Sequence, residues 1–164
     1  ADLRIASTVA ATVMTHVAPI CIASGLAVAE AVAASVRGED PFAAAQAATW
    51  DEAIARALDE VERGWSPGGE AWSGHGRSHP LKTVKSALWA VRRDRPAEEV
   101  LLDLVHRGGD ADTHAAVAGA LLGARDGIEA LPGRWRAALQ VGPLLSGIAQ
   151  RFERSRSGSP PNGP

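Results

Sequence analysis

Two carboxylates and a hydroxyl lie close together in the stretch Gly108-Gly109-Asp110-Ala111-Asp112-Thr113. Asp110 and Asp112 are two residues apart, so they do not share a face of a regular helix, whereas an irregular loop can curl both around one point. Hard divalent cations bind such oxygens, and a cation would offset the repulsion between the two acids. The stretch therefore indicates a candidate metal site.

Capping is the alternative role for these side chains. An aspartate or threonine directly before an apolar run commonly caps a helix, and the alanine- and glycine-rich run from His114 to Ala124 predicts a helix here. One carboxylate is enough for a cap, and a second beside it is unfavourable unless a positive charge is near. The local pattern leaves both roles open.

The rest of the chain predicts helices and no sheet. The 164 residues are 46% hydrophobic but only 4% aromatic, contain no tyrosine, and lack long runs of alternating β-branched residues. This length suits one domain with a real core. We expect an all-α, compact, multi-helix orthogonal bundle over residues 1–150 and a disordered tail over residues 151–164, which ends in low-complexity sequence.

Several helix boundaries are visible in the sequence. Gly38-Glu39-Asp40-Pro41 ends one helix and begins the next, since glycine suits a helix end and proline a first turn. Helical spacing then predicts one helix from Phe42 to Glu62. Gly119 and Gly123 lower helix propensity, which predicts the close crossing of another helix backbone there.

Charge and cysteine content exclude some classes of function. A net charge of −2 gives no electrostatic footprint for nucleic acid. The single cysteine, Cys21, excludes an internal disulfide and suits a reducing, cytoplasmic location. Residues 17–36 are apolar, but Pro19, Glu30 and the many alanines favour a buried helix over a membrane span. We expect neither a nucleic-acid nor a membrane partner.

Residues 108–135 resemble the C-terminal signature of the ADP-ribosylglycohydrolase family. The shared features are a Gly-Gly-Asp-x-Asp-Thr turn, a small-residue helix, and a Leu-Pro-x-x-Trp start to the next helix. The resemblance extends to residues 83–90, to the acidic helix over residues 97–105, and to Thr15-His16. It implies the C-terminal half of a larger helical domain of that family.

The resemblance also implies a reaction and its site residues. The family hydrolyses the glycosidic bond between ADP-ribose and a protein side chain or a small molecule, using a pair of Mg²⁺ or Mn²⁺ ions. By this resemblance Asp110, Asp112 and Thr113 are metal ligands, and His16 and Gly109 contact the substrate. It assigns no catalytic residue in this chain.

Part of the family pattern is absent. The family's Gly-Asp-x-x-Gly segment and its Thr-Asp-Asp cluster, which complete the metal site, are missing, and the chain contains no Asp-Asp pair. We expect a fragment that lacks the N-terminal metal ligands. The alternative is a non-catalytic helical paralogue or interaction module, in which Asp110 and Asp112 only cap a helix.

Overall fold

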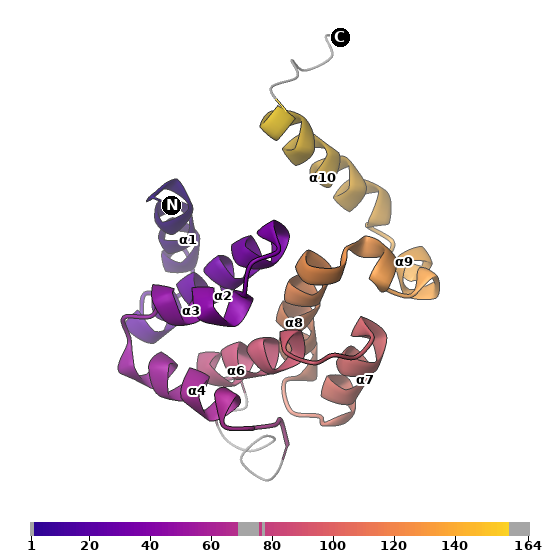
Figure 1. Ribbon diagram of the computed structural model, residues 1–164. Helices are drawn as coiled ribbons and strands as arrows, with labels where there is room; N and C mark the ends of the chain where they lie inside the picture. The colour runs from indigo at the N-terminus through magenta and orange to yellow at the C-terminus, as the bar shows by residue number, and fades with distance from the viewer. Residues whose placement is uncertain (1, 69–75, 77, 158–164) are drawn as a thin grey trace. The chain divides into compact units, whose positions relative to one another are not determined.

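The regular elements of the chain are helices. The computed structural model describes residues 2–68, 76 and 78–157, and these contain no strand, which confirms the predicted all-α class. In chain order the elements are α1 (Asp2–Val13), α2 (Pro19–Arg37), α3 (Pro41–Ala48), α4 (Glu52–Glu62), α6 (Pro80–Val91), α7 (Ala97–His106), α8 (Ala111–Asp126), the 3₁₀ helix η1 (Ile128–Ala130), α9 (Gly133–Ala138) and α10 (Gly142–Ser157) (Figure 1).

The chain divides into two compact units, residues 1–130 and residues 131–164. The predicted domain over residues 1–150 spans this boundary. The predicted tail begins as helix, because α10 continues through Ser157, where glutamine, arginine and glutamate are good helix formers. Residues 158–164 lie outside the described part of the chain.

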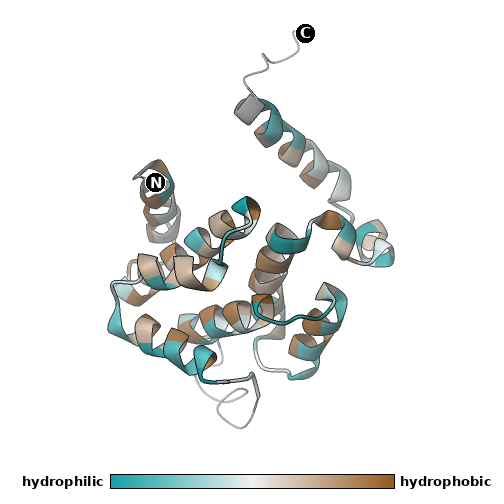
Figure 2. Ribbon diagram, viewed as in Figure 1, coloured by the Kyte–Doolittle hydropathy of each residue, from teal (hydrophilic) through white to brown (hydrophobic). Residues whose placement is uncertain are grey.

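Helix α8 lies at the centre of the first unit. It packs against α6, α7 and α2, while α2 packs against α1 and α3 (Figure 1). Leu88, Leu104, Leu121 and Leu122, from α6, α7 and α8, are completely buried. Burial of each leucine contributes roughly 1.5–3 kcal/mol. On α4, hydrophilic and hydrophobic stretches alternate along the helix, as expected for an element with one buried face (Figure 2).

Among the described helices, α2 alone is long and apolar enough, by length and composition, to cross a membrane. A core helix meets the same criteria. In the first unit α2 packs against α1, α3, α6 and α8, and Ala27, Ala31 and Ala34 on it are completely buried. These contacts bury one face of α2, where small side chains allow neighbouring helices to approach closely.

The prediction of one helix over residues 42–62 is wrong. Thr49 is extended, with φ −84° and ψ 123°, and ends α3. Asp51 then caps α4, because its carboxylate accepts hydrogen bonds of 2.9 and 3.2 Å from the amides two and three residues further on. This local side-chain bonding competes with a continuous helix. Trp50 lies in the break and is 57% exposed.

The predicted close crossing at Gly119 and Gly123 is also absent from the described residues. A Cβ atom added to Gly119 would lie 3.8 Å from the Leu101 side chain, which is ordinary van der Waals contact. One added to Gly123 would meet nothing within 4 Å. Neither glycine is required by a neighbouring backbone in this part of the chain.

Candidate functional site

The candidate ligands follow a turn that favours glycine. Gly108 and Gly109 have φ values of 71° and 72°, in the left-handed region that residues with a Cβ rarely adopt. These two residues turn the chain from the end of α7 into α8. Asp110 follows with φ −92° and ψ 55° and occupies the position before the first turn of α8.

Asp110 does not cap α8. Its side chain makes no hydrogen bond to the backbone amides of the helix. Instead, Asp110 Oδ1 accepts a hydrogen bond of 3.0 Å from the Thr113 hydroxyl, and its carboxylate is also hydrogen-bonded to Ser78. Asp112 lies in the first turn of α8 and is exposed. The structure thus brings Asp110, Asp112 and Thr113 together around one turn.

The hydrogen bonds keep Asp110 ionised. Burial acts to raise the pKa of Asp110, but the hydrogen bonds with Ser78 and Thr113 and the charge of His114 lower it. The net result is a pKa below the ordinary value for aspartate. At neutral pH this side chain therefore presents a carboxylate.

His114 lies buried beneath the turn, with none of its surface exposed. Its Nδ1 atom is 3.1 Å from the hydroxyl of Thr83 on α6. Its backbone N–H donates a hydrogen bond of 3.0 Å to the carbonyl oxygen of Asp110. This side chain connects the start of α8 to α6.

Ser78 and His114 were missed by sequence reasoning. His114 comes four residues before the buried Ala118, a spacing that places both side chains on the same face of α8. That spacing was a usable signal for a buried histidine. Ser78 lies two residues before the start of α6, and nothing local indicates that it meets a residue so distant in the sequence.

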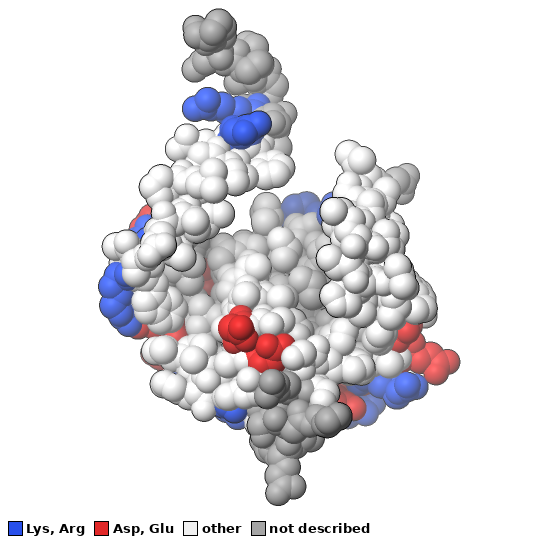
Figure 3. Space-filling view, turned by 180° about the vertical axis from the view of Figure 1, so that it is seen from behind, with Lys and Arg blue, Asp and Glu red and all other residues white. Residues whose placement is uncertain are grey.

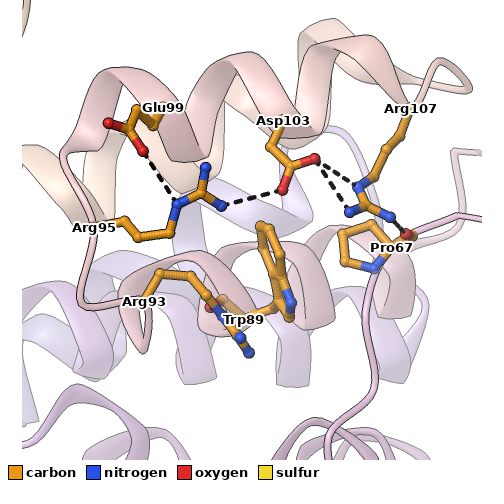
Figure 4. A network of polar contacts seen from close by, with 7 residues as sticks. All are labelled: Pro67, Trp89, Arg93, Arg95, Glu99, Asp103 and Arg107. Atoms are coloured by element: carbon orange, nitrogen blue, oxygen red, sulfur yellow. Dashed lines mark hydrogen bonds and ion pairs between the residues drawn. The ribbon is translucent and has the colours of Figure 1, made fainter.

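Arg107 anchors the start of the loop before α6 next to the same turn. It donates hydrogen bonds from Nε to Asp103 at 3.2 Å and from Nη1 to the carbonyl oxygen of Pro67 (Figure 4). Asp103 is also bound by Arg95, so α7 carries a short chain of ion pairs (Figure 4). The residue before Gly108 is therefore held by side-chain contacts as well as by the helix.

His16 is not linked to this turn. It lies exposed between α1 and α2, and its Nδ1 atom is 2.9 Å from the Thr15 hydroxyl. Gly109 is exposed beside Asp110. No hydrogen bond or ion pair among the described residues joins His16 to Asp110 or Asp112, so its substrate role stays a prediction.

The donor atoms of the turn suit a hard cation. Two carboxylates and a hydroxyl are the oxygen ligands that Mg²⁺ and Mn²⁺ prefer. Within the described residues, however, no three His, Cys, Asp or Glu side chains are close enough together to hold a metal ion. Asp110, Asp112 and Thr113 could thus supply part of a coordination shell.

One part of the surface carries an isolated acidic group. Near the centre of the face seen in Figure 3, acidic side chains form a small group among uncharged side chains, while further acidic and basic side chains lie toward the edges. Recognition of a charged ligand on such a surface depends on individual groups at close range, because exposed charges are screened over about 10 Å at 0.1 M salt.

A comparison with protein families identifies the chain. The family model described as ADP-ribosylglycohydrolase matches residues 2–162, essentially the whole chain. Comparisons with curated proteins and with solved structures gave no match. Members of the matched family hydrolyse ADP-ribose linkages and are generally metal-dependent. The resemblance seen in the sequence is confirmed, and the chain belongs to the ADP-ribosylglycohydrolase family.

Proposed function

We propose that this chain holds Mg²⁺ or Mn²⁺ through Asp110, Asp112 and Thr113, as part of a hydrolase that removes ADP-ribose from a modified protein or small molecule. One observation carries the proposal. Asp110 occupies the capping position of α8, but its carboxylate makes no bond to the helix amides and its pKa is lowered. An ionised side chain with no capping role is available to a cation.

The residues of the turn have distinct roles in this proposal. Asp110 and Asp112 supply negative charge, and the Thr113 hydroxyl supplies a neutral oxygen while it orients Asp110. A bound cation would hold ribose hydroxyls and lower the pKa of a water molecule. Gly109, with no side chain, leaves the substrate side of the turn open. His16 would donate a hydrogen bond to a phosphate oxygen, a role that rests on the family resemblance.

The test is a titration of the full chain with Mn²⁺, followed by calorimetry. The Asp110→Asn/Asp112→Asn variant keeps the size of both side chains but removes their charge. We expect its affinity to fall by on the order of a hundredfold, because affinity for hard cations depends on the number of charged ligands. The matched control is Asp51→Asn, since asparagine caps a helix as well as aspartate does.

Each result has a defined meaning. Binding that the double variant loses and the Asp51→Asn control retains supports the proposal. Equal binding by all three proteins shows that other residues hold the ion. A folded chain that binds no Mn²⁺ overturns the proposal that these residues hold the ion in this chain. Release of ADP-ribose from modified proteins, measured with and without Mn²⁺, then tests the reaction itself.

A further inference from the structure

We infer that His114 is a positioning residue for the candidate site: its buried contact with Thr83 holds the first turn of α8 against α6 and thereby fixes the carboxylates of Asp110 and Asp112. The inference rests on the proposed function for its consequence, cation binding. The ordering of the first turn of α8 by His114 does not depend on cation binding.

The side chain of His114 bonds to another helix, unlike the other buried polar side chains of the described residues. The buried polar side chains of the described residues are Ser24, Ser35, Ser86 and His114. Each serine donates to the carbonyl four residues earlier in its own helix, at 2.7, 2.9 and 2.5 Å. These bonds satisfy the serine hydroxyls but do not connect one helix to another. His114, by contrast, meets Thr83, 31 residues away on another helix.

A histidine is a costly side chain to bury at position 114. An imidazole needs a hydrogen-bond partner when it is buried, because desolvation of a polar group is otherwise unfavourable. The other buried side chains of α8, Ala118, Leu121 and Leu122, are apolar. An apolar side chain at position 114 would fill the same space without that requirement. A histidine here adds a directional contact that fixes the rotation of α8 at one point.

His114 is close along the chain to the candidate ligands Asp110 and Asp112. The His114 amide donates to the carbonyl oxygen of Asp110, so the backbone of the candidate ligand is bonded directly to the residue that Thr83 holds. Ser78, just before α6, is hydrogen-bonded to the Asp110 carboxylate itself. The start of α6 therefore holds residue 110 through its side chain and, by way of His114, through its backbone.

Residues outside the coordination shell that orient metal ligands commonly change affinity by one to two orders of magnitude when they are replaced. The side chain of Thr83 has no place in the proposed set of ligands. It acts only through His114, and replacement of Thr83 therefore tests positioning without the removal of a ligand.

The experiment compares three variants of the full chain. Thr83→Val removes the hydroxyl and keeps the branched shape. Thr83→Ser keeps the hydroxyl. Ser86→Ala is the matched control, because it removes a different buried hydroxyl from the same helix, one that donates to the Lys82 carbonyl oxygen within α6. Urea unfolding of each variant shows that it folds.

Two measurements are made on each protein. Amide hydrogen exchange in the metal-free protein reports the opening of the first turn of α8, read at the His114 amide. Calorimetric titration with Mn²⁺ reports cation affinity. We expect Thr83→Val to speed exchange at His114 about tenfold, the effect of one lost hydrogen bond, and to weaken Mn²⁺ binding about tenfold. Thr83→Ser should restore both values, and Ser86→Ala should change neither.

The outcomes separate this inference from the proposed function. Unchanged exchange in Thr83→Val, or an equal change in Ser86→Ala, overturns the inference. Faster exchange with unchanged Mn²⁺ affinity overturns its link to the ligands. A wild-type chain that binds no Mn²⁺ overturns the proposed function and the link, while the exchange rates still decide whether His114 orders the turn.

Discussion

Aspartates with the same position relative to a helix have different bonds in this protein. Asp40 accepts a hydrogen bond of 2.8 Å from the amide of Phe42 at the start of α3, and Asp51 accepts two at the start of α4. Asp110, before α8, bonds to the Thr113 and Ser78 side chains instead. At the scale of single residues, this difference separates two carboxylates that cap helices from one that bonds to side chains.

This difference predicts that truncation of Asp51 and of Asp110 to alanine lowers the free energy of unfolding by different amounts. Asp51→Ala should lower the free energy of unfolding by about 1 kcal/mol, because a cap with two amide partners is lost. Asp110→Ala should change it by less than about 0.5 kcal/mol in metal-free buffer, because no helix amide loses a partner and water can replace the carboxylate at the exposed hydroxyls of Ser78 and Thr113. Urea unfolding of the two variants and the wild type checks this. An equal cost at both positions would return Asp110 to a capping role.

At the scale of elements, α6 and α8 are joined near both ends. Near their starts, Thr83 meets His114. Near their ends, Arg125 Nη1 donates hydrogen bonds of 2.6 and 3.0 Å to the carbonyl oxygens of Val91 and Arg93. A neighbouring acid, Asp126, binds the other edge of the Arg125 guanidinium at 2.6 Å and raises its pKa. Helix α8 is thus fixed in position by polar contacts as well as by its leucines.

The interior of α8 leads to a second prediction. Gly123 is helical, and a Cβ added there meets nothing within 4 Å among the described residues. Gly123→Ala should therefore raise the free energy of unfolding by roughly 0.5–1 kcal/mol, the difference in helix propensity between the two residues. Thermal or urea unfolding measures the change.

Gly38→Ala provides the comparison. Gly38 also has free space around it, but its φ is 71°, so alanine there should be destabilising. A loss of stability in Gly123→Ala would mean that another part of the molecule contacts this face of α8.

At the scale of the whole molecule, sequence reasoning succeeded where the signals were local. The turn at residues 108–113 indicated the family, and the bounds of α7 follow from Pro96 and its first-turn acids. It failed where two local signals competed. Trp50 fits the apolar spacing of one continuous helix, whereas Asp51 is a residue type that caps a new one. The contact of Ser78 with Asp110 depends on the folding of α6 against α8, and neither residue carries a local sign of it.

Acid stability is also a property of the whole molecule. Glu30 on α2 accepts hydrogen bonds of 2.7 and 2.6 Å from Arg4 on α1. These bonds, with the attraction of the two charges, lower the pKa of Glu30 although burial acts to raise it. Since the pKa is lower in the folded chain than in the unfolded one, the pair stabilises the fold fully above the unfolded value of about 4.3 and loses this contribution as the pH falls below it.

Glu30→Gln should therefore reduce stability near neutral pH and flatten the fall in stability between about pH 5 and pH 3. Unfolding free energies measured across this range check the prediction. Glu52→Gln serves as the control, since Glu52 is 91% exposed and pairs with an exposed arginine, an arrangement that contributes little. Identical curves for the wild type and Glu30→Gln would contradict the prediction.

The two left-handed glycines before Asp110 affect how a mutational scan of this protein should be interpreted. Any side chain at Gly108 or Gly109 forces an L-residue into a conformation that costs roughly 1–2 kcal/mol, whether or not a ligand is ever bound. Both positions will therefore rank as intolerant in a scan that scores abundance alone. Intolerance at Gly109 is thus no evidence of substrate contact, whereas Thr113, which has an ordinary helical backbone, is a position where loss of activity with unchanged abundance would be informative.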